Sequence, residues 1–208
     1  PRITRLPCVP DDHGWFTLLQ QAASATLRDR LMLALAYYGA LRRAEVTALR
    51  VDDLDLGLRL IRVRAETTKN HRERIVCYSP AVAPAAHLQQ LRQSGVSGGP
   101  LFRSVSDRNY GMPLSIWSWS KTVRSWGLKS GLPYFSTHTF RHLRLTHLAR
   151  AGWKLHELAT YAGHRDPRTT QVYLHLSGTD LAARMAGAVA ELGRKVAGLV
   201  FADRGFVL

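Results

Sequence analysis

The sequence predicts a mainly α-helical domain with a small antiparallel β-hairpin or three-stranded sheet. Its 208 residues, 46% of them hydrophobic, are enough to build one sizeable core. Most of the chain carries helix start and stop signals around apolar residues that are three and four positions apart. One segment, residues 58–78, instead alternates or is β-branched in the manner of strands.

The first predicted helix begins at Thr26 and ends at Gly39. Thr26 and Asp29 have the spacing of a capping box, apolar residues follow on one face, and glycine is a common helix stop. A second helix is predicted from near Arg42 to about Arg50. It is followed by three carboxylates, which would cap or solvate a turn or, as the alternative, hold two metals in a nuclease. These are Asp52, Asp53 and Asp55.

Two strands are predicted at 58–65 and 73–78, joined by a polar turn at 68–72. After them the chain is helical again, and three tryptophans of one helix are expected in the core: Trp117, Trp119 and Trp126. The helices are predicted over 81–93, 115–129, 136–152, 154–162 and 166–173, with a last one from Thr179.

The net charge indicates which kind of partner the chain binds. With 29 Lys and Arg against 15 Asp and Glu, the net charge is +14, which favours nucleic acid over an acidic protein or an anionic lipid surface. Of the 29 cations 24 are Arg, which binds phosphate with a two-pronged guanidinium; high-GC coding is the alternative cause of that excess. The two cysteines, Cys8 and Cys77, lie too far apart to indicate a disulfide scaffold or a metal site, which suits a reducing cytosol.

Several side chains with useful chemistry lie at helix ends. His138 and Arg141 are three apart on the first turn of a predicted helix, where free amides already attract anions. Tyr173 lies nine residues after His164. Arg42 follows another helix stop, with Glu45 one turn later, and Lys69 lies at the tip of the hairpin, where it can reach into a groove. Together these groups suit the recognition of a phosphate.

Each of these residues also has a structural explanation. Arg42 is a natural ion-pair partner of Glu45, and Tyr173 at helical spacing is commonly a packing residue. His138 and His142 are four apart and would fit a metal, but no carboxylate or third histidine accompanies them at useful spacing. What favours function is the combination of these residues in one chain.

The combination resembles the catalytic domain of tyrosine recombinases, the phage integrase family. The resemblance extends from about Trp15 to Leu176, and the spacing of the last three motifs agrees with the family. It is carried by GALRRAE at 39–45, TKNHRER at 68–74, HTFRH at 138–142, AGHRD at 162–166 and Tyr173.

The resemblance implies a site-specific recombinase, of integrase or excisionase type, that needs no cofactor, metal or ATP. Tyr173 would be the nucleophile that forms a 3′-phosphotyrosyl intermediate, and Lys69 would protonate the leaving 5′ hydroxyl. Glu45 would orient its neighbours. The transition-state charge would be met by Arg42, His138, Arg141 and His164. Type IB topoisomerase-like DNA relaxation, or a non-catalytic DNA-binding or synapsis protein, is the alternative.

The partners implied are double-stranded DNA recombination sites and three further copies of the chain. We expect a homotetramer in the synaptic complex, little self-association without DNA, no membrane, and a cytoplasmic or nucleoid-associated protein of a bacterial or archaeal cell. The hairpin holds six cations against two glutamates and is expected to lie along the duplex as a rail. DNA contacts are expected from Arg62, Arg64, Arg72, Arg74, Arg144, Arg165 and Arg168.

The chain divides into three parts on this interpretation. Residues 1–13 are expected to be a linker from a missing N-terminal DNA-binding domain, because prolines dominate them. Residues 14–178 form the catalytic domain. Residues 179–208 form a C-terminal helix and an apolar tail, which would dock on a neighbouring protomer or fold onto its own domain.

Overall fold

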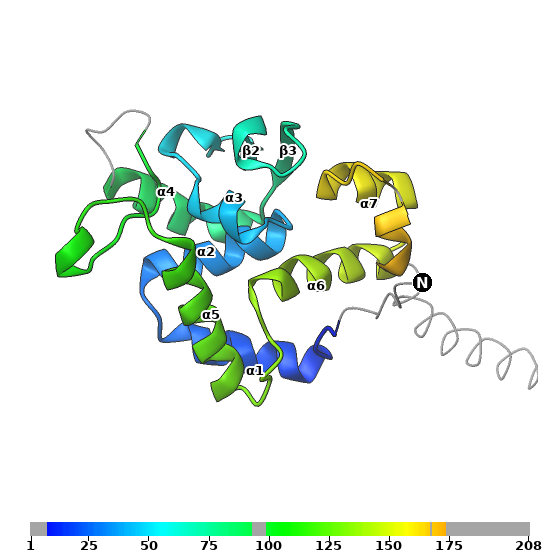
Figure 1. The fold of residues 1–208 in the computed structure, drawn as a ribbon, viewed down its shortest axis with the longest axis horizontal. Helices are drawn as coiled ribbons and strands as arrows, with labels where there is room; N and C mark the ends of the chain where they lie inside the picture. Colours follow the sequence, from blue (N-terminus) through cyan, green and yellow to red (C-terminus); the bar gives the residue numbers. More distant parts are fainter. Residues whose placement is uncertain (1–7, 93–98, 167, 174–208) are drawn as a thin grey trace, which may run out of the picture.

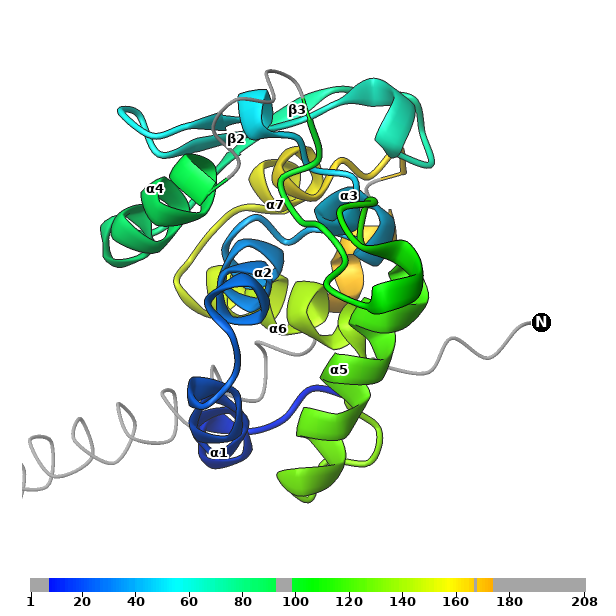
Figure 2. The ribbon, with the colours of Figure 1, turned by 90° about the vertical axis from the view of Figure 1, so that its left-hand side faces the viewer.

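The computed structural model describes residues 8–92, 99–166 and 168–173. The middle of the molecule is formed by helices α2 (Leu27–Tyr38), α3 (Arg43–Thr47) and α6 (Thr137–Arg150). Figures 1 and 2 show a small sheet and α7 (Leu155–Ala162) on one side of this middle layer, and α1 (Asp12–Ala23) and α5 (Ile116–Lys129) on the other. The mainly helical prediction with one three-stranded antiparallel sheet is confirmed.

The N-terminal part contains one helix that the sequence analysis missed. Helix α1, Asp12–Ala23, begins two residues before the predicted start of the catalytic domain, and its buried face includes Trp15 and Leu18. The side chain of Asp11 caps it by accepting a hydrogen bond of 2.8 Å from the main-chain N–H of Gly14. The segment expected to be a linker therefore leads directly into the packed domain.

Helices α2 and α3 follow the predicted caps. Helix α2, Leu27–Tyr38, is capped by the Thr26 hydroxyl and ends at Gly39, as predicted. Helix α3, Arg43–Thr47, is shorter than predicted. Its expected last turn is not helical: Arg50 pairs with Pro100 in an isolated β-bridge. A 3-10 turn, Val51–Asp53, follows, and at its start the Asp53 carboxylate accepts the N–H of Arg50 at 2.8 Å. Asp53 thus has the capping role that the sequence analysis favoured.

The sheet has the order β1-β2-β3 and is antiparallel throughout. Its strands are β1, Leu54–Asp55, β2, Leu60–Val63, and β3, Arg74–Cys77. The register pairs Val63 with Arg74, so that the β2–β3 connection, which carries Lys69, extends beyond the end of the sheet. A 3-10 turn, Ala65–Thr67, and the hydroxyl of Thr68, which accepts the Arg72 N–H at 3.0 Å, shape this connection.

The remaining helices agree with the prediction within a few residues. They are α4, Ala83–Arg92, α5, Ile116–Lys129, α6, Thr137–Arg150, and α7, Leu155–Ala162; residues 168–173 are also helical. The prediction that Trp117 lies in the core is wrong, because it is 71% exposed, whereas Trp119 and Trp126 are buried as expected. Two residues along a helix turn the side chain by about 200°, so Trp117 lies on the outer face of α5. The predicted helix from Thr179 and the apolar tail lie outside the described residues.

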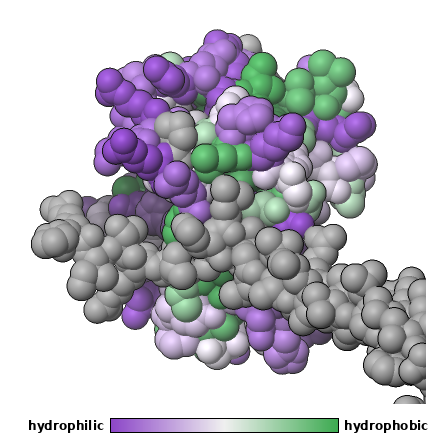
Figure 3. Space-filling view, turned by 90° about the vertical axis from the view of Figure 1, so that its right-hand side faces the viewer, coloured by the Kyte–Doolittle hydropathy of each residue, from purple (hydrophilic) through white to green (hydrophobic). Residues whose placement is uncertain are grey.

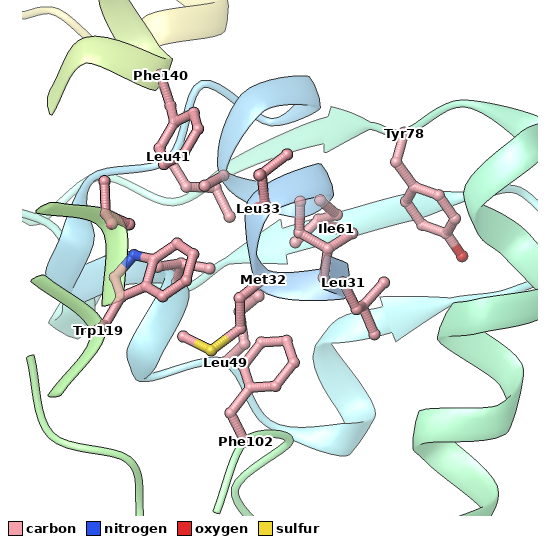
Figure 4. Packing of buried hydrophobic residues seen from close by; sticks show 14 of the residues in the cluster. Leu31, Met32, Leu33, Leu41, Leu49, Ile61, Tyr78, Phe102, Trp119 and Phe140 are labelled. Atoms are coloured by element: carbon pink, nitrogen blue, oxygen red, sulfur yellow. The ribbon is translucent and has the colours of Figure 1, made fainter. Parts of the chain in front are cut away.

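The main core gathers on α2 and the inner face of the sheet. Figure 4 shows Met32 of α2, Ile61 of β2 and Trp119 of α5 among the residues that fill it. A second, smaller cluster joins α6 and α7 to the turn after α2, and Tyr173 belongs to it together with Leu158. The last described residue is therefore held by apolar packing. No described helix is both long and apolar enough to cross a lipid bilayer.

Candidate active site

Arg42 is placed by the turn between α2 and α3. Ala40 adopts φ +46°, a left-handed conformation that costs a non-glycine residue roughly 1 kcal/mol and that reverses the chain after Gly39. Arg42 is then the N-cap of α3, and Glu45 lies one turn later. The Glu45 carboxylate accepts hydrogen bonds from the main-chain N–H of Arg42 at 2.8 Å and from its guanidinium at 2.7 Å. The ion pair considered from the sequence is therefore present.

A second guanidinium binds the same carboxylate. Arg74, on β3, donates to the two oxygens of Glu45 at 3.1 and 2.6 Å. Burial by itself raises the pKa of Glu45, but the hydrogen bonds and charge of Arg74, with the hydrogen bonds of Arg42, outweigh it and lower that pKa to about 2. Two arginines and one carboxylate leave this group with a net positive charge.

Arg141 occupies the centre of the site. It comes from the first turn of α6, is 4% exposed, and donates to the carbonyl oxygens of Ala40, at 2.7 Å, and Ala162. These bonds tie the turn before α3 to the end of α7. Burial, followed by the charges of Arg42 and Arg74, lowers the pKa of Arg141 to about 9, which still leaves it protonated at neutral pH.

The two predicted histidines lie around this arginine. His138, on the same first turn, is exposed, and desolvation followed by the charges of Arg43, Arg141 and Arg42 lowers its pKa. His164 follows Gly163, whose φ of +64° ends α7 in the left-handed conformation that suits glycine.

The Nδ1 atom of His164 lies 2.8 Å from the hydroxyl of Thr170. Burial, then the charges of Arg141, Arg42 and Arg74, lowers the pKa of His164 to about 3. Its imidazole is therefore uncharged at neutral pH.

Tyr173 reaches the site from the last described helical segment. It is 2% exposed, and its ring stacks on that of His164 with centroids 6.5 Å apart. The hydroxyl lies 2.8 Å from Nδ1 of His142. Burial raises the pKa of Tyr173, and the charges of Arg141 and Arg42 act in the opposite direction. A phenol surrounded by cations and uncharged imidazoles is what a nucleophile for an anionic ester requires.

Lys69 is a predicted site residue that makes no contact with the other candidates among the described residues. It is exposed in the β2–β3 connection, and none of the contacts found among the described residues links it to the arginines or to Tyr173. Its neighbour Asn70 does approach the site, because its side-chain amide donates to the carbonyl of Gly163 at 3.1 Å. The connection that carries Lys69 is thus anchored beside His164.

The cations expected to contact DNA divide into two groups. Arg72, Arg165 and Arg168 are exposed, and so is Arg62, which forms a surface ion pair with Glu73 at 2.9 Å. The others have interactions inside the domain. Arg64 is bound to Asp53 and Glu66, Arg74 to Glu45, and Arg144 lies over the rings of Tyr37 and Tyr38.

Two features were missed by the sequence analysis. His142 was considered only as half of a metal pair, although its place directly after Arg141 puts it on the same helical turn as the site. Arg43, which had no assigned role, lies over the exposed ring of Trp117 at 5.6 Å. Across the described ranges, three or more His, Cys, Asp or Glu side chains nowhere form a group that could hold a metal.

A groove of about 790 Å³ opens beside the site between β3 and α7. Arg74, Gly163 and His164 line it on the side of the site, and Arg72 and Trp153 extend it outward. Figure 3 shows a face of the molecule on which hydrophilic side chains predominate above the grey segment, with a few hydrophobic ones between them. Arg74 and His164 of the site are therefore next to a groove that opens to solvent.

Comparison with known proteins shows the family to which the chain belongs. The chain matches the model of the Phage integrase family over residues 15–179. It is 30% identical over 169 residues to tyrosine recombinase XerC of Mycobacterium tuberculosis, covering 79% of this chain and 55% of that protein. It is 34% identical over 163 residues to tyrosine recombinase XerD of Lacticaseibacillus casei, covering 76% and 53%. The chain thus spans about half the length of the curated relatives it matches.

Solved structures share the fold. XerA recombinase superposes with a TM-score of 0.73 at 24% identity, covering 89% of this chain and 66% of that one. XerH bound to its difH substrate in a post-cleavage complex gives 0.71 at 19% identity, covering 90% and 54%. The family model includes every residue of the cluster from Arg42 to Tyr173, so this chain belongs to the phage integrase family.

Proposed function

We propose that this chain carries the catalytic centre of a site-specific DNA recombinase, which cleaves and rejoins DNA through a 3′-phosphotyrosyl intermediate. The observation that supports this best is the position of Tyr173. Its buried phenol lies among Arg42, Arg141 and His164, which come from three other segments of the chain. Packing alone gives no reason to place the buried Arg141 and the partly buried Arg42 beside a tyrosine, since an ionised side chain is costly to remove from water.

The chemistry follows from these groups. A scissile phosphodiester carries one negative charge, and attack at phosphorus increases the charge on its non-bridging oxygens. Arg42, Arg141 and the remaining ring nitrogen of His164 would hold those oxygens, with His138 as a further donor. The Tyr173 hydroxyl gives up its proton to water as its oxygen bonds to phosphorus and the bond to O5′ breaks, and Lys69 supplies a proton to the departing oxygen. Attack by a 5′ hydroxyl then reverses the steps, which is why no ATP is needed.

Double-stranded DNA is the proposed substrate. The named relatives are tyrosine recombinases, XerH was solved with difH, and the Tn1549 integrase, another similar structure, was solved with a circular intermediate DNA. In this chain Arg72, Arg165 and Arg168 offer exposed charge close to the site residues in sequence. Exchange between two duplexes breaks four strands, so with one Tyr173 per protomer we extend the proposal to a homotetramer on DNA.

A covalent-trapping assay tests the proposal. A randomised library of nicked duplexes, in which a short cleaved fragment diffuses away, is incubated with the chain, and protein–DNA adducts are recovered under denaturing conditions. Wild type is expected to form adducts and Tyr173→Phe none. Tyr37→Phe is the matched control, because Tyr37 also has a histidine partner, His147, at 2.7 Å but belongs to another part of the fold.

The rival functions give different results in the same system. Relaxation of supercoiled DNA without any recombinant product would favour a type IB topoisomerase-like activity. DNA binding with no adduct would favour a non-catalytic synapsis protein. Either result would contradict the proposed recombinase.

A further inference from the structure

His142 makes a contact that none of the assigned catalytic roles explains. Its Nδ1 lies 2.8 Å from the hydroxyl of Tyr173, and the two rings are 5.8 Å apart with an angle of 35° between their planes. His164 stacks on the same phenol ring. The reacting oxygen is therefore in contact with a side chain that has no place in the phosphate-binding set.

The helix that carries His142 explains why this contact matters. His142 directly follows Arg141 on α6, whereas Tyr173 belongs to a separate segment 31 residues later. The hydrogen bond therefore connects the nucleophile to the element that holds the phosphate-binding arginine. Groups on one rigid helix keep their spacing, and an error of about 1 Å in a reacting atom can reduce a rate about a hundredfold.

The protonation of the two rings fits a hydrogen bond from phenol to imidazole. Burial, followed by the charges of His138 and Arg141, lowers the pKa of His142 to about 4, so its ring is uncharged at neutral pH and one nitrogen can accept. Burial raises the pKa of Tyr173, so its phenol keeps the hydrogen that it would donate.

We propose that His142 is a positioning residue for the nucleophile: its Nδ1 accepts the hydrogen bond of the Tyr173 hydroxyl and fixes that oxygen relative to the phosphate on Arg141. This inference rests on the proposed recombinase function and adds a residue to it. Arg141 binds the ester, and His142, one residue later, aims the attacking group. His142 itself takes no part in bond making.

The experiment uses substrates recovered with wild type in the trapping assay and measures adduct formation in a single turnover at saturating protein. His142→Phe keeps the ring and removes the acceptor, and His142→Asn places an amide oxygen near the position of Nδ1. His147→Phe is the matched control, because His147 lies on the same helix and makes the same kind of bond, 2.7 Å to Tyr37, away from the nucleophile. DNA affinity and thermal unfolding are measured for all three.

The expected results separate positioning from folding. His142→Phe lowers the adduct rate at least about tenfold with DNA affinity unchanged, His142→Asn recovers most of the loss, and His147→Phe reacts like wild type. A His142→Phe protein as fast as wild type, or an Asn variant as slow as Phe, overturns the inference while the recombinase proposal stands.

If His142→Phe does not fold, His142→Asn is compared with His142→Gln, whose amide extends past Nδ1. Equal rates then overturn the inference, and a faster Asn variant supports it. Absence of any adduct with wild type is a different result, because it contradicts the proposed function itself.

Discussion

Arg74 on strand β3 holds both carboxylate oxygens of Glu45 on helix α3, at 3.1 and 2.6 Å. The carboxylate in turn holds Arg42, so one buried anion connects the sheet to the arginine that begins α3. The Nε atom of Arg74 is also buried and has no hydrogen-bond partner in the described part of the chain. The pair positions Arg42 and limits the positive charge that α3 and β3 would otherwise concentrate there.

Loss of Arg74 is expected to destabilise the domain. Arg74→Leu leaves Glu45 with Arg42 alone, and removing one partner of a buried ion pair typically costs about 3–5 kcal/mol. Urea unfolding at pH 7 measures the change. Arg62→Leu, which breaks an ion pair whose arginine is 59% exposed, is the matched control and is expected to change stability by less than about 1 kcal/mol. Equal effects from both variants would contradict a structural role for Arg74.

Acid sensitivity is expected to depend on Glu45. A folded-state pKa of about 2 instead of 4.5 corresponds to about 3 kcal/mol of stability, which is complete above the unfolded-state pKa. It is lost as the pH falls from about 5 toward 2. Glu45→Gln should therefore have a flatter decline in unfolding free energy between pH 6 and pH 3 than wild type. The control is Glu157→Gln, at an exposed helix start: its unfolding free energy should decline as steeply as that of wild type.

Arg141 should not tolerate replacement by lysine. Its guanidinium donates to the carbonyls of Ala40 and Ala162 at once, and a single ammonium group has no matching planar arrangement. Arg141→Lys is expected to lower the rate of adduct formation by about a hundredfold or more. Arg124→Lys, exposed on α5, is the control with an expected rate near wild type. An active Arg141→Lys enzyme would show that charge alone suffices.

Exposed and internally paired cations should differ in the salt dependence of DNA binding. Removing a phosphate contact lowers the slope of log affinity against log salt by about one. Arg72→Ala and Arg165→Ala should each do so, because both side chains are exposed. Arg64→Ala should leave the slope unchanged, because its guanidinium is bound to Asp53, Glu66 and the carbonyl of Ala48. An equal change in all three would mean that Arg64 leaves its partners to meet DNA.

The sequence was informative where a residue's place depends on its near neighbours. Thr26, Gly39 and Gly163 end or begin helices through local backbone preferences, and their positions agree with the prediction. Arg141 lies in the first turn of one such helix, and His164 directly follows the end of another. The candidate site could therefore be predicted from helix caps and stops taken together with the resemblance to the phage integrase family.

Contacts between distant segments could not be predicted in this way. The pairing of Arg74 with Glu45 depends on the sheet register, and the bond between His142 and Tyr173 depends on how α6 packs against a later segment. The outward direction of Trp117 depends on which face of α5 is covered. Helix α1 was missed for a different reason, because nearby prolines hid a short amphipathic pattern that starts at Asp11.

The position of the covalent bond tests the central claim most directly. Adducts trapped on nicked duplexes are digested with protease, and the modified peptide is sequenced by mass spectrometry. A single nucleotide adduct on the phenol oxygen of Tyr173, absent from Tyr173→Phe, is the predicted result. An adduct on another residue, or one that persists in Tyr173→Phe, would contradict the account.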